Sequence, residues 1–224
     1  MKNVRIYQID QKKDIDDVAF VDYAHATRLS DINPEIYERV FIGDLATAQS
    51  LDDVFEELNI TKNPLVRGHS LSVSDVVVND EGAFYCDSFG FQKIEFDETK
   101  AYKDPSLHRV VYVEPGREPF VTEIGADLDS EQAAVYGWIE LIYNEDDTII
   151  VGNEEAKLIG MAGNRHLDYG GIIAGPFFII GDAGEDFRSL DDEEVDKYMR
   201  KYATPENITQ EEVQADMGYS ITVW

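Results

Sequence analysis

The segment from Asn153 to Gly171 gathers most of the side chains in the second half of the chain that could bind a polar ligand. It reads NEEAKLIGMAGNRHLDYGG, which combines amides, carboxylates and one arginine with four glycines directly before an apolar run. Polar residues joined by glycine-rich turns at the edge of a sheet are typical of pocket-forming elements. The candidate ligand-binding residues are Asn153, Glu155, Asn164 and Arg165.

Arg165 has two interpretations. It is one of only eight basic residues after Pro105, so it should have a specific carboxylate or backbone partner. In the first interpretation it holds an anionic ligand, and a nearby carboxylate acts as a base. In the second it pairs with a carboxylate of the protein itself, and the segment is only a structural loop.

A second cluster of hydrogen-bonding side chains runs from His69 through Ser70, Ser72 and Ser74 to Asp75. A histidine with a carboxylate six residues later could form an acid-base pair. The commoner role of such a stretch is to satisfy backbone donors at the start of a strand, and we favour that role here.

The motifs of common enzyme chemistries are missing from the sequence. It has no GxxxxGK[ST] phosphate loop, no GxGxxG after a strand, no GxSxG and no HExxH. Cys86, the single cysteine, lies in the apolar stretch AFYCDSFGF and is typical of a core-facing thiol. We therefore predict no catalytic residue, no metal site and no cofactor.

The chain is strongly acidic, with a formal net charge of −27 from 46 acidic and 19 basic residues. Both halves contribute, because the residues up to Pro105 carry −10 and the rest carry −17. Such a charge repels DNA, RNA and anionic lipid, since binding them depends on Lys and Arg. We therefore predict no direct binding to nucleic acid or to a membrane.

The acidity fits a basic protein partner, in particular one to which carboxylates are offered in place of DNA phosphates. The alternative is that the charge serves solubility or a salty cell interior. The carboxylates could imitate a phosphate track if they share one face, and they are solvated surface if they are scattered. The candidate partner-binding residues are Asp52, Asp53, Glu56, Glu57, Asp182, Glu185, Asp186, Asp191, Asp192, Glu193 and Glu194.

The sequence predicts a cytoplasmic protein. One cysteine excludes an internal disulfide, and the opening MKNVRIYQID alternates polar and apolar residues, unlike a signal peptide. No stretch approaches the roughly 18 apolar residues that a membrane span needs.

Hydrophobic periodicity and turn residues predict a protein rich in strands. Strands are expected at residues 4–9, 35–42, 76–78, 83–86, 89–96, 109–113, 120–124, 138–143, 148–151, 172–180 and 220–223. Helices are expected at residues 51–58, after a cap at Ser50; at 129–136, capped by Asp129 or Ser130; and at 189–202 and 209–215. We expect an α+β fold of two small mixed domains, residues 1–105 and 106–224, each an antiparallel sheet covered by one or two helices.

Two family resemblances cover most of the chain. The stretch GHSLSVSDVVVNDEGAFYCDSFGFQKI, with the opening VRIYQI, resembles the YodL-like domain of Firmicutes proteins from conjugative and phage-like elements. The second half resembles a bacterial domain family of unknown function that occurs with it. This resemblance is carried by RVVYVEPG, GWIELIY, VGNEEAKLIGMAGNR, IIAGPFFIIG and FRSLDDEEVDKYM.

The resemblance implies a mobile genetic element, in which small acidic proteins counter host defence or act in multi-domain effectors. Neither family offers a catalytic residue to carry over. We therefore expect a non-enzymatic accessory protein that binds a basic protein, as a DNA mimic against a host defence or DNA-processing enzyme. The alternatives are a ligand binder or enzyme that uses the Asn153–Asp168 loop, and a structural protein-protein interaction module.

Overall fold

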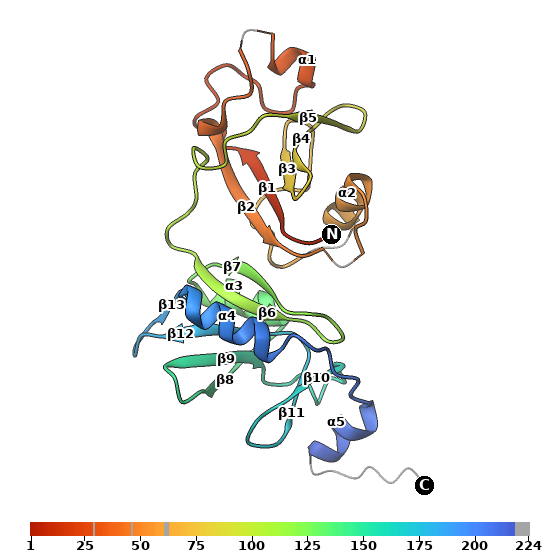
Figure 1. Ribbon diagram of the computed structural model, residues 1–224, viewed down its shortest axis with the longest axis vertical. Coiled ribbons are helices and arrows are strands. Elements are labelled where there is room, and N and C mark those ends of the chain that lie inside the picture. Colours follow the sequence, from red (N-terminus) through yellow and green to blue (C-terminus); the bar gives the residue numbers. More distant parts are fainter. Residues whose placement is uncertain (29, 46, 61–62, 218–224) are drawn as a thin grey trace. The chain divides into compact units, whose positions relative to one another are not determined.

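The computed structural model describes residues 1–28, 30–45, 47–60 and 63–217. The chain divides into two compact units, Met1–Pro105 and Ser106–Trp224, which we call the first and the second domain (Figure 1). Each contains an antiparallel sheet with helices beside it. The predicted α+β class is therefore confirmed.

The first domain is built on a five-stranded sheet with the strand order β2-β1-β3-β4-β5. All neighbouring strands in it are antiparallel. The strands are β1 (Val4–Ile9), β2 (Tyr37–Gly43), β3 (Val76–Asn79), β4 (Gly82–Cys86) and β5 (Phe91–Ile94). Asn79 pairs with Gly82, so β3 and β4 form the predicted hairpin.

Short helical segments accompany this sheet: α1 (Tyr23–Ala26), the 3-10 turn η1 (Pro34–Ile36) and α2 (Leu51–Ile60). α2 begins as predicted after Ser50, whose Oγ accepts a 3.2 Å hydrogen bond from the Asp53 amide. The strand predicted from Glu35 begins only at Tyr37, because Pro34 starts the 3-10 turn and lacks the N–H that a ladder needs.

The core of the first domain is rich in aromatic residues. Tyr7, Tyr37 and Tyr85 are each exposed by 1% or less, and the Phe96 ring packs against the first two. Their hydroxyl groups reach polar partners, since Tyr37 donates to the Ser74 carbonyl and Tyr85 to the Val21 carbonyl. The buried rings therefore also anchor loops to the sheet.

The second domain has a six-stranded sheet with the order β7-β6-β12-β9-β8, and β13 pairs with β12 beside that path. Its strands are β6 (His108–Val113), β7 (Phe120–Ile124), β8 (Ile139–Tyr143), β9 (Thr148–Asn153), β12 (Phe177–Asp182) and β13 (Phe187–Arg188). A separate two-stranded sheet joins β10 (Gly163–His166) to β11 (Ile172–Ala174). The helices are α3 (Leu128–Val135), α4 (Asp192–Lys201) and α5 (Gln210–Asp216).

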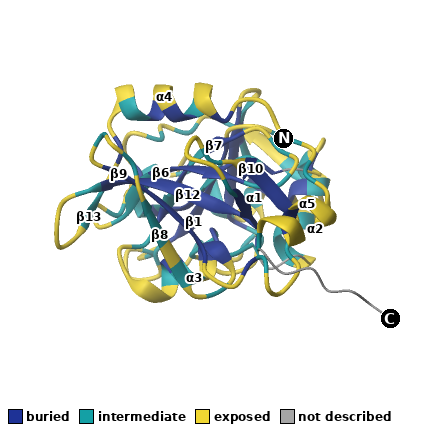
Figure 2. Ribbon diagram, turned by 90° about the horizontal axis from the view of Figure 1, so that it is seen from below, coloured by how far each residue is buried: buried dark blue, intermediate teal, exposed yellow. Residues whose placement is uncertain are grey.

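Both faces of the six-stranded sheet are covered. Phe177 and Ile179 on β12 join a core that includes Val195 and Tyr198 of α4. Side chains alternate along a strand, so Phe178 points to the other face. On that side Ala134 of α3 is fully buried. Figure 2 shows the central strands as buried and much of α4 as exposed, as expected for a sheet between amphipathic helices.

The apolar run at residues 172–180 is not the single kinked strand that its hydrophobicity predicts. It forms two strands, because Gly175 adopts φ +72° and redirects the chain between β11 and β12. The first three residues pair with β10, and Phe177 onward enters the large sheet. The polar stretch at Asn164 and Arg165 is thus strand rather than loop.

The helices of the second domain begin at carboxylate or hydroxyl caps. α3 is capped by Asp127 rather than by Asp129 or Ser130, and it ends at Tyr136 with φ +60°. Asp191 and Glu194 form a capping box at α4, so this helix begins three residues later than predicted. The helix predicted at 209–215 begins one residue later, because Thr209 is its N-cap. The strand predicted at residues 220–223 lies outside the described residues.

Candidate functional site

Asn153 holds the end of α3. Its buried amide Nδ2 donates 3.1 Å hydrogen bonds to the carbonyls of Val135 and Tyr136, and its Oδ1 accepts from the Glu155 amide at 2.8 Å. These bonds satisfy carbonyls that a helix terminus leaves without intrahelical partners. These three contacts of the Asn153 side chain are thus structural, although the side chain also borders the cavity described below.

Asn164 and Arg165 lie inside the second domain, exposed by 0% and 1%. The Asn164 amide donates to the carbonyls of Val113 and Gly175 at 3.0 and 2.8 Å. It thereby ties the end of β6 to the bend between β11 and β12. This position explains why an amide, with donors for two carbonyls, occurs in an apolar surrounding.

The Arg165 guanidinium is bonded to oxygens of the protein itself. Nη1 donates to the Asn164 carbonyl and Oδ1, and Nη2 donates to the carbonyls of Arg117 and Tyr202 at 2.7 and 2.9 Å. Burial lowers its pKa, and the Glu206 charge opposes that shift. Both Nη groups are therefore engaged by main-chain and amide oxygens, and Arg165 does not border the cavity beside its own segment.

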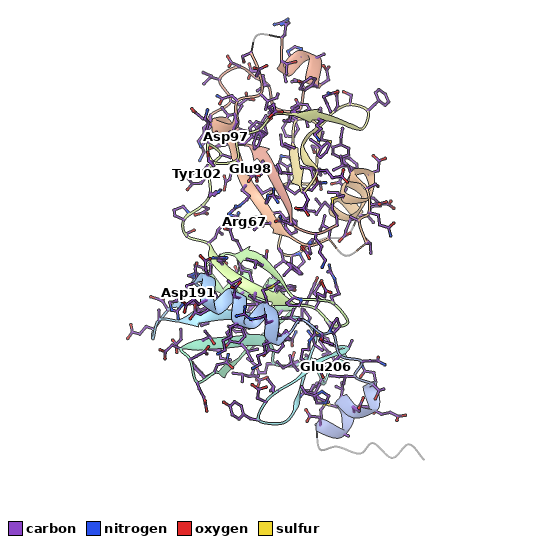
Figure 3. All side chains as sticks on the ribbon, viewed as in Figure 1. Arg67, Asp97, Glu98, Tyr102, Asp191 and Glu206 are labelled. Carbon is purple, nitrogen blue, oxygen red and sulfur yellow. The ribbon has the colours of Figure 1, made fainter. Side chains whose placement is uncertain are left out.

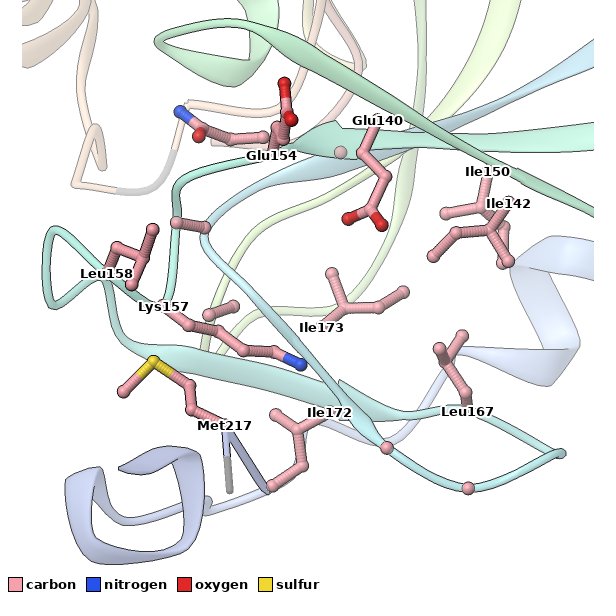
Figure 4. Close-up of a pocket in the computed structure, with 16 residues that line it drawn as sticks. Glu140, Ile142, Ile150, Glu154, Lys157, Leu158, Leu167, Ile172, Ile173 and Met217 are labelled. Carbon is pink, nitrogen blue, oxygen red and sulfur yellow. The ribbon is translucent and has the colours of Figure 1, made fainter. Parts of the chain in front are cut away.

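A cavity of about 400 Å³ lies where the six-stranded sheet, the β10–β11 sheet and the loop after β9 meet (Figure 4). Ile142, Ile150 and Ile173 provide apolar walls, and the Glu140 carboxylate points into the space. Of the four predicted ligand residues only Asn153 lines it, and the Glu155 side chain is exposed elsewhere on the loop. A pocket thus forms beside this segment, with a different set of residues.

Among the described residues that line this cavity, Lys157 is the one cation, and its charge is neutralised. Lys157 Nζ donates to Asp216 Oδ2 at 2.6 Å, and the same carboxylate oxygen accepts from the Ile172 amide at 3.0 Å. The Lys157 hydrogen bond lowers the pKa of Asp216. The cavity therefore offers apolar surface and acidic groups, and its chemistry suits an apolar or weakly cationic molecule better than an anion.

The predicted acidic segments of the second domain come together at one end of the large sheet. The Asp182 amide bonds to the Asp147 carbonyl at 2.8 Å, and Arg188 Nη2 joins the Asp147 carbonyl to Glu194. Asp191 lies at the start of α4 (Figure 3). We call this region the acidic end: Glu145, Asp146, Asp147, Asp182, Glu185, Asp186, Asp191, Asp192, Glu193 and Glu194.

Three cations are paired within the acidic end. Arg109 bonds to Asp192 at 2.6 Å, Arg188 forms a two-pronged pair with Glu194 at 2.7 and 2.8 Å, and Lys197 reaches Asp146 at 2.5 Å. Asp146 is also bonded by Thr148 and Tyr198, and its pKa falls to about 2: burial opposes the change, but these hydrogen bonds and Lys197 outweigh it. The other seven carboxylates have no cation partner among the described residues.

The acidic residues of the first domain have mixed roles. Asp53 accepts hydrogen bonds from the amides of Gln49 and Ser50, and Glu57 accepts from the Thr47 hydroxyl at 2.6 Å. These two carboxylates hold the chain that enters α2. Asp52 and Glu56 are exposed on the helix.

The His69–Asp75 pair is mainly a loop anchor. Asp75 is 1% exposed, and its Oδ2 accepts from the Ser72 amide and Gln8 Nε2 at 2.8 and 3.0 Å. His69 Nδ1 lies 3.8 Å from the same oxygen. Burial raises the pKa of Asp75 to about 7, although its hydrogen bonds and His69 oppose this shift. The favoured structural role of the cluster agrees with these contacts.

The single cysteine and the possible metal-binding clusters are further candidate sites of chemistry. Cys86 is a buried free thiol, and burial raises its pKa to about 12. Within the described residues, no three His, Cys, Asp or Glu side chains are grouped so as to hold a metal ion. Among the described helices, none has the length and apolarity to cross a bilayer.

Two residues that the sequence analysis did not single out line another cavity, on the α3 face of the large sheet: His108 and Glu131. Glu131 is 7% exposed. A periodicity signal could have found it, because Glu131 lies three and four residues before the buried Ala134 and Val135 of α3.

The fold and these sites define a two-domain α+β protein whose second domain carries the acidic end and the two cavities described above. Residues 3–96 match the family model of the YodL-like domain, and residues 108–203 match that of the Domain of unknown function (DUF3846). Both predicted resemblances are thereby confirmed. Comparison with curated proteins and with solved structures returned no match.

Proposed function

We propose that the protein is a non-enzymatic accessory protein of a mobile genetic element and binds a basic protein partner. In this proposal its carboxylates take the place of DNA phosphates in front of a host defence or DNA-processing enzyme. The acidic end carries the proposal. It sets ten carboxylates against three cations on neighbouring segments of one domain.

Exposure and spacing support this role. Most of the carboxylates of the acidic end are exposed, and they extend from two turns of the sheet to the first turn of α4. Carboxylates held on rigid elements create a focused negative potential, which speeds the approach of a basic surface and selects against acidic ones. The match to a YodL-like domain supports the mobile-element context.

The experiment is capture of partners from a host lysate, followed by affinity measurements with the captured protein over a salt series. The test variant combines Glu185→Gln, Asp186→Asn and Glu193→Gln, whose native side chains form no hydrogen bond or ion pair with the described residues. The control combines Asp16→Asn, Glu35→Gln and Glu211→Gln, which are exposed and lie outside the acidic end. Both variants lose the same charge.

We expect a DNA-handling protein whose affinity falls as salt rises, because screened charges attract less. The test variant should bind at least tenfold more weakly and the control nearly normally, and a DNA duplex should compete with the wild-type protein. If the two variants weakened binding equally, binding would depend on net charge and not on the acidic end, which would contradict the proposal. Binding that is insensitive to salt would also contradict it.

A second candidate function is binding of a small molecule in the 400 Å³ cavity beside the Asn153–Asp168 loop. Its apolar isoleucine walls and the Glu140 carboxylate favour this candidate. Replacing Ala174, a small residue of the lining, with Phe should fill part of the space and abolish uptake of an apolar fluorescent probe. Unchanged uptake by the Ala174→Phe variant would show that the probe binds outside this cavity, which would contradict the candidate function.

A further inference from the structure

The second cavity of the second domain has a volume of about 620 Å³ and borders the acidic end. Leu141 of β8 and Ile149 of β9 form apolar wall, and Leu128 and Tyr143, exposed by 55% and 62%, stand at its border. Asp182 lines it from the end of β12, and Glu185 and Asp186 line it from the turn before β13. The cavity is therefore half apolar and half acidic.

Glu131 is the feature of this cavity that most requires explanation. Its residue is 93% buried, because α3 turns this side chain toward the sheet together with Ala134. In the described part of the chain its carboxylate has no hydrogen-bond or ion-pair partner. Burial raises its pKa, with a smaller contribution from Asp127. Its carboxylate oxygens are not among the fully buried unpaired atoms, so they open onto the cavity, where a bound cation or donor would pair with a partly desolvated carboxylate.

The other polar groups of the cavity do not supply that partner. His108 lines it, but burial lowers the pKa of this imidazole and Asp186 only opposes the shift, so the ring is neutral at neutral pH. No Lys or Arg is among the described lining residues. The cavity thus presents acidic groups, one of them deeply placed, with no internal cation to neutralise them.

We infer that this cavity binds the cationic end of a lysine or arginine side chain that the basic partner inserts beside Glu131. The aliphatic stem of either side chain would lie against Leu141 and Ile149, and its charged head would reach the carboxylates. Tyr143 and Leu128 would cover the stem at the entrance. This inference rests on the proposed function and names the residue type that anchors the partner.

The apolar lining of the cavity indicates a ligand with an aliphatic stem. A hydrated inorganic cation would gain nothing from the leucine and isoleucine surface, and the described residues hold no cluster suited to a metal ion. An anionic ligand would meet four carboxylates: Glu131, Asp182, Glu185 and Asp186. A cation on an aliphatic chain satisfies both halves of the cavity.

The test is NMR titration of the full chain, at low salt, with Nα-acetyl-lysine methylamide, its arginine counterpart and its norleucine counterpart. Norleucine keeps the aliphatic stem and lacks the charge. We expect the two cationic probes to shift the amide signals of Glu131, Leu141 and Tyr143, and norleucine to bind at least tenfold more weakly.

The variant is Glu131→Gln, which keeps the shape of the side chain and removes its charge. Its control is Glu211→Gln, an exposed glutamate that lines neither cavity. Glu131→Gln should weaken the binding of both cationic probes at least tenfold and Glu211→Gln should leave it unchanged. Asp186→Asn is a second variant. Asp186 lies in an exposed turn, so this substitution does not disturb the packing of α3, and it should weaken binding of the cationic probes by a smaller factor.

The outcomes separate this inference from the proposed function. Equal binding of norleucine, or no effect of Glu131→Gln on the probes and on the captured partner, would overturn the inference. The proposed function would stand in that case if the partner still bound in a salt-dependent way through the acidic end. Probe binding in a protein that captures no basic partner would overturn the assignment of the site to a partner's side chain.

Discussion

Arg165 Nη2 donates a 2.9 Å hydrogen bond to the main-chain carbonyl of Tyr202, the residue that caps the C-terminus of α4. The same nitrogen bonds to the Arg117 carbonyl at 2.7 Å, in the turn between β6 and β7. One buried guanidinium therefore joins β10, this turn and the end of a helix. Positive charge at a helix C-terminus is also favoured by the helix dipole.

Arg165→Met should lower the free energy of unfolding of the second domain by about 3 kcal/mol or more, because it leaves several buried oxygens without donors. Urea unfolding followed by the amide signals of β10 and β12 measures this change. Arg200→Met is the matched control, since Arg200 lies on α4 with its side chain 76% exposed. Equal losses in the two variants would contradict the role of Arg165 as an internal clamp.

The raised pKa of Asp75 predicts how the stability of the first domain depends on pH. Burial raises its pKa from 3.8 to about 7 in the folded protein. Between these values the folded state holds a proton that the unfolded state releases, so the contribution of Asp75 to stability is present at low pH and is lost as pH rises toward 7.

Asp75→Asn should remove this part of the pH dependence. Both hydrogen bonds from Ser72 and Gln8 go to Oδ2, so an Asn oxygen can accept them while its amide resembles the protonated acid. Urea unfolding at several pH values between 4 and 7.5, read from the amide signals of β3, provides the comparison. Asp16→Asn, an exposed substitution, should leave the dependence as it is. A wild-type domain that grows more stable from pH 4 to 7 through this residue would refute the prediction.

Gly175 divides the apolar run at residues 172–180 into two strands, and we expect alanine to be poorly tolerated there. Its φ is +72°, and an added Cβ would lie 2.5 Å from Met161 Sδ. Gly175→Ala should lower the free energy of unfolding by roughly 1–3 kcal/mol through backbone strain and crowding. Thermal unfolding measures the loss.

Gly160→Ala is the control for that substitution. Gly160 has φ +76° and nothing within 4 Å of an added Cβ, so it carries the backbone strain without the crowding. Gly175→Ala should therefore be the more destabilising of the two. The reverse order would mean that Met161 moves aside without cost.

Asp216 connects α5 to the rest of the second domain. Its carboxylate accepts hydrogen bonds from Lys157 and from the Ile172 amide. Asp216→Ala should speed the hydrogen exchange of the α5 amides severalfold and leave β12 protected, because loss of a local anchor opens only a local unit. Asp196→Ala, whose side chain is 72% exposed, should leave α5 unchanged. Faster exchange throughout the domain would show that α5 supports the whole sheet.

Most elements of the fold could be predicted from local pattern. The strand at Val4–Ile9, the Ser50 cap of α2 and the helix α4 each depend on neighbours along the chain, and the structure has all three, although β1 is buried along almost its whole length and not at alternate residues. The prediction of one strand at residues 172–180 is wrong, because the division of this run depends on pairing with distant strands and not on neighbours along the chain. A continuous apolar run does not reveal which strands its two parts pair with, and only Gly175 marked the division.

The sequence by itself determined the acidity, the α+β class and the absence of familiar catalytic motifs, because composition and periodicity carry these properties. Only the tertiary structure decided that Arg165 bonds to buried carbonyls, that Asp182 and Glu194 share one end of a sheet, and that Glu131 lines a cavity. These are contacts between residues far apart in the chain. Strand order and helix packing create them, and no local spacing encodes them.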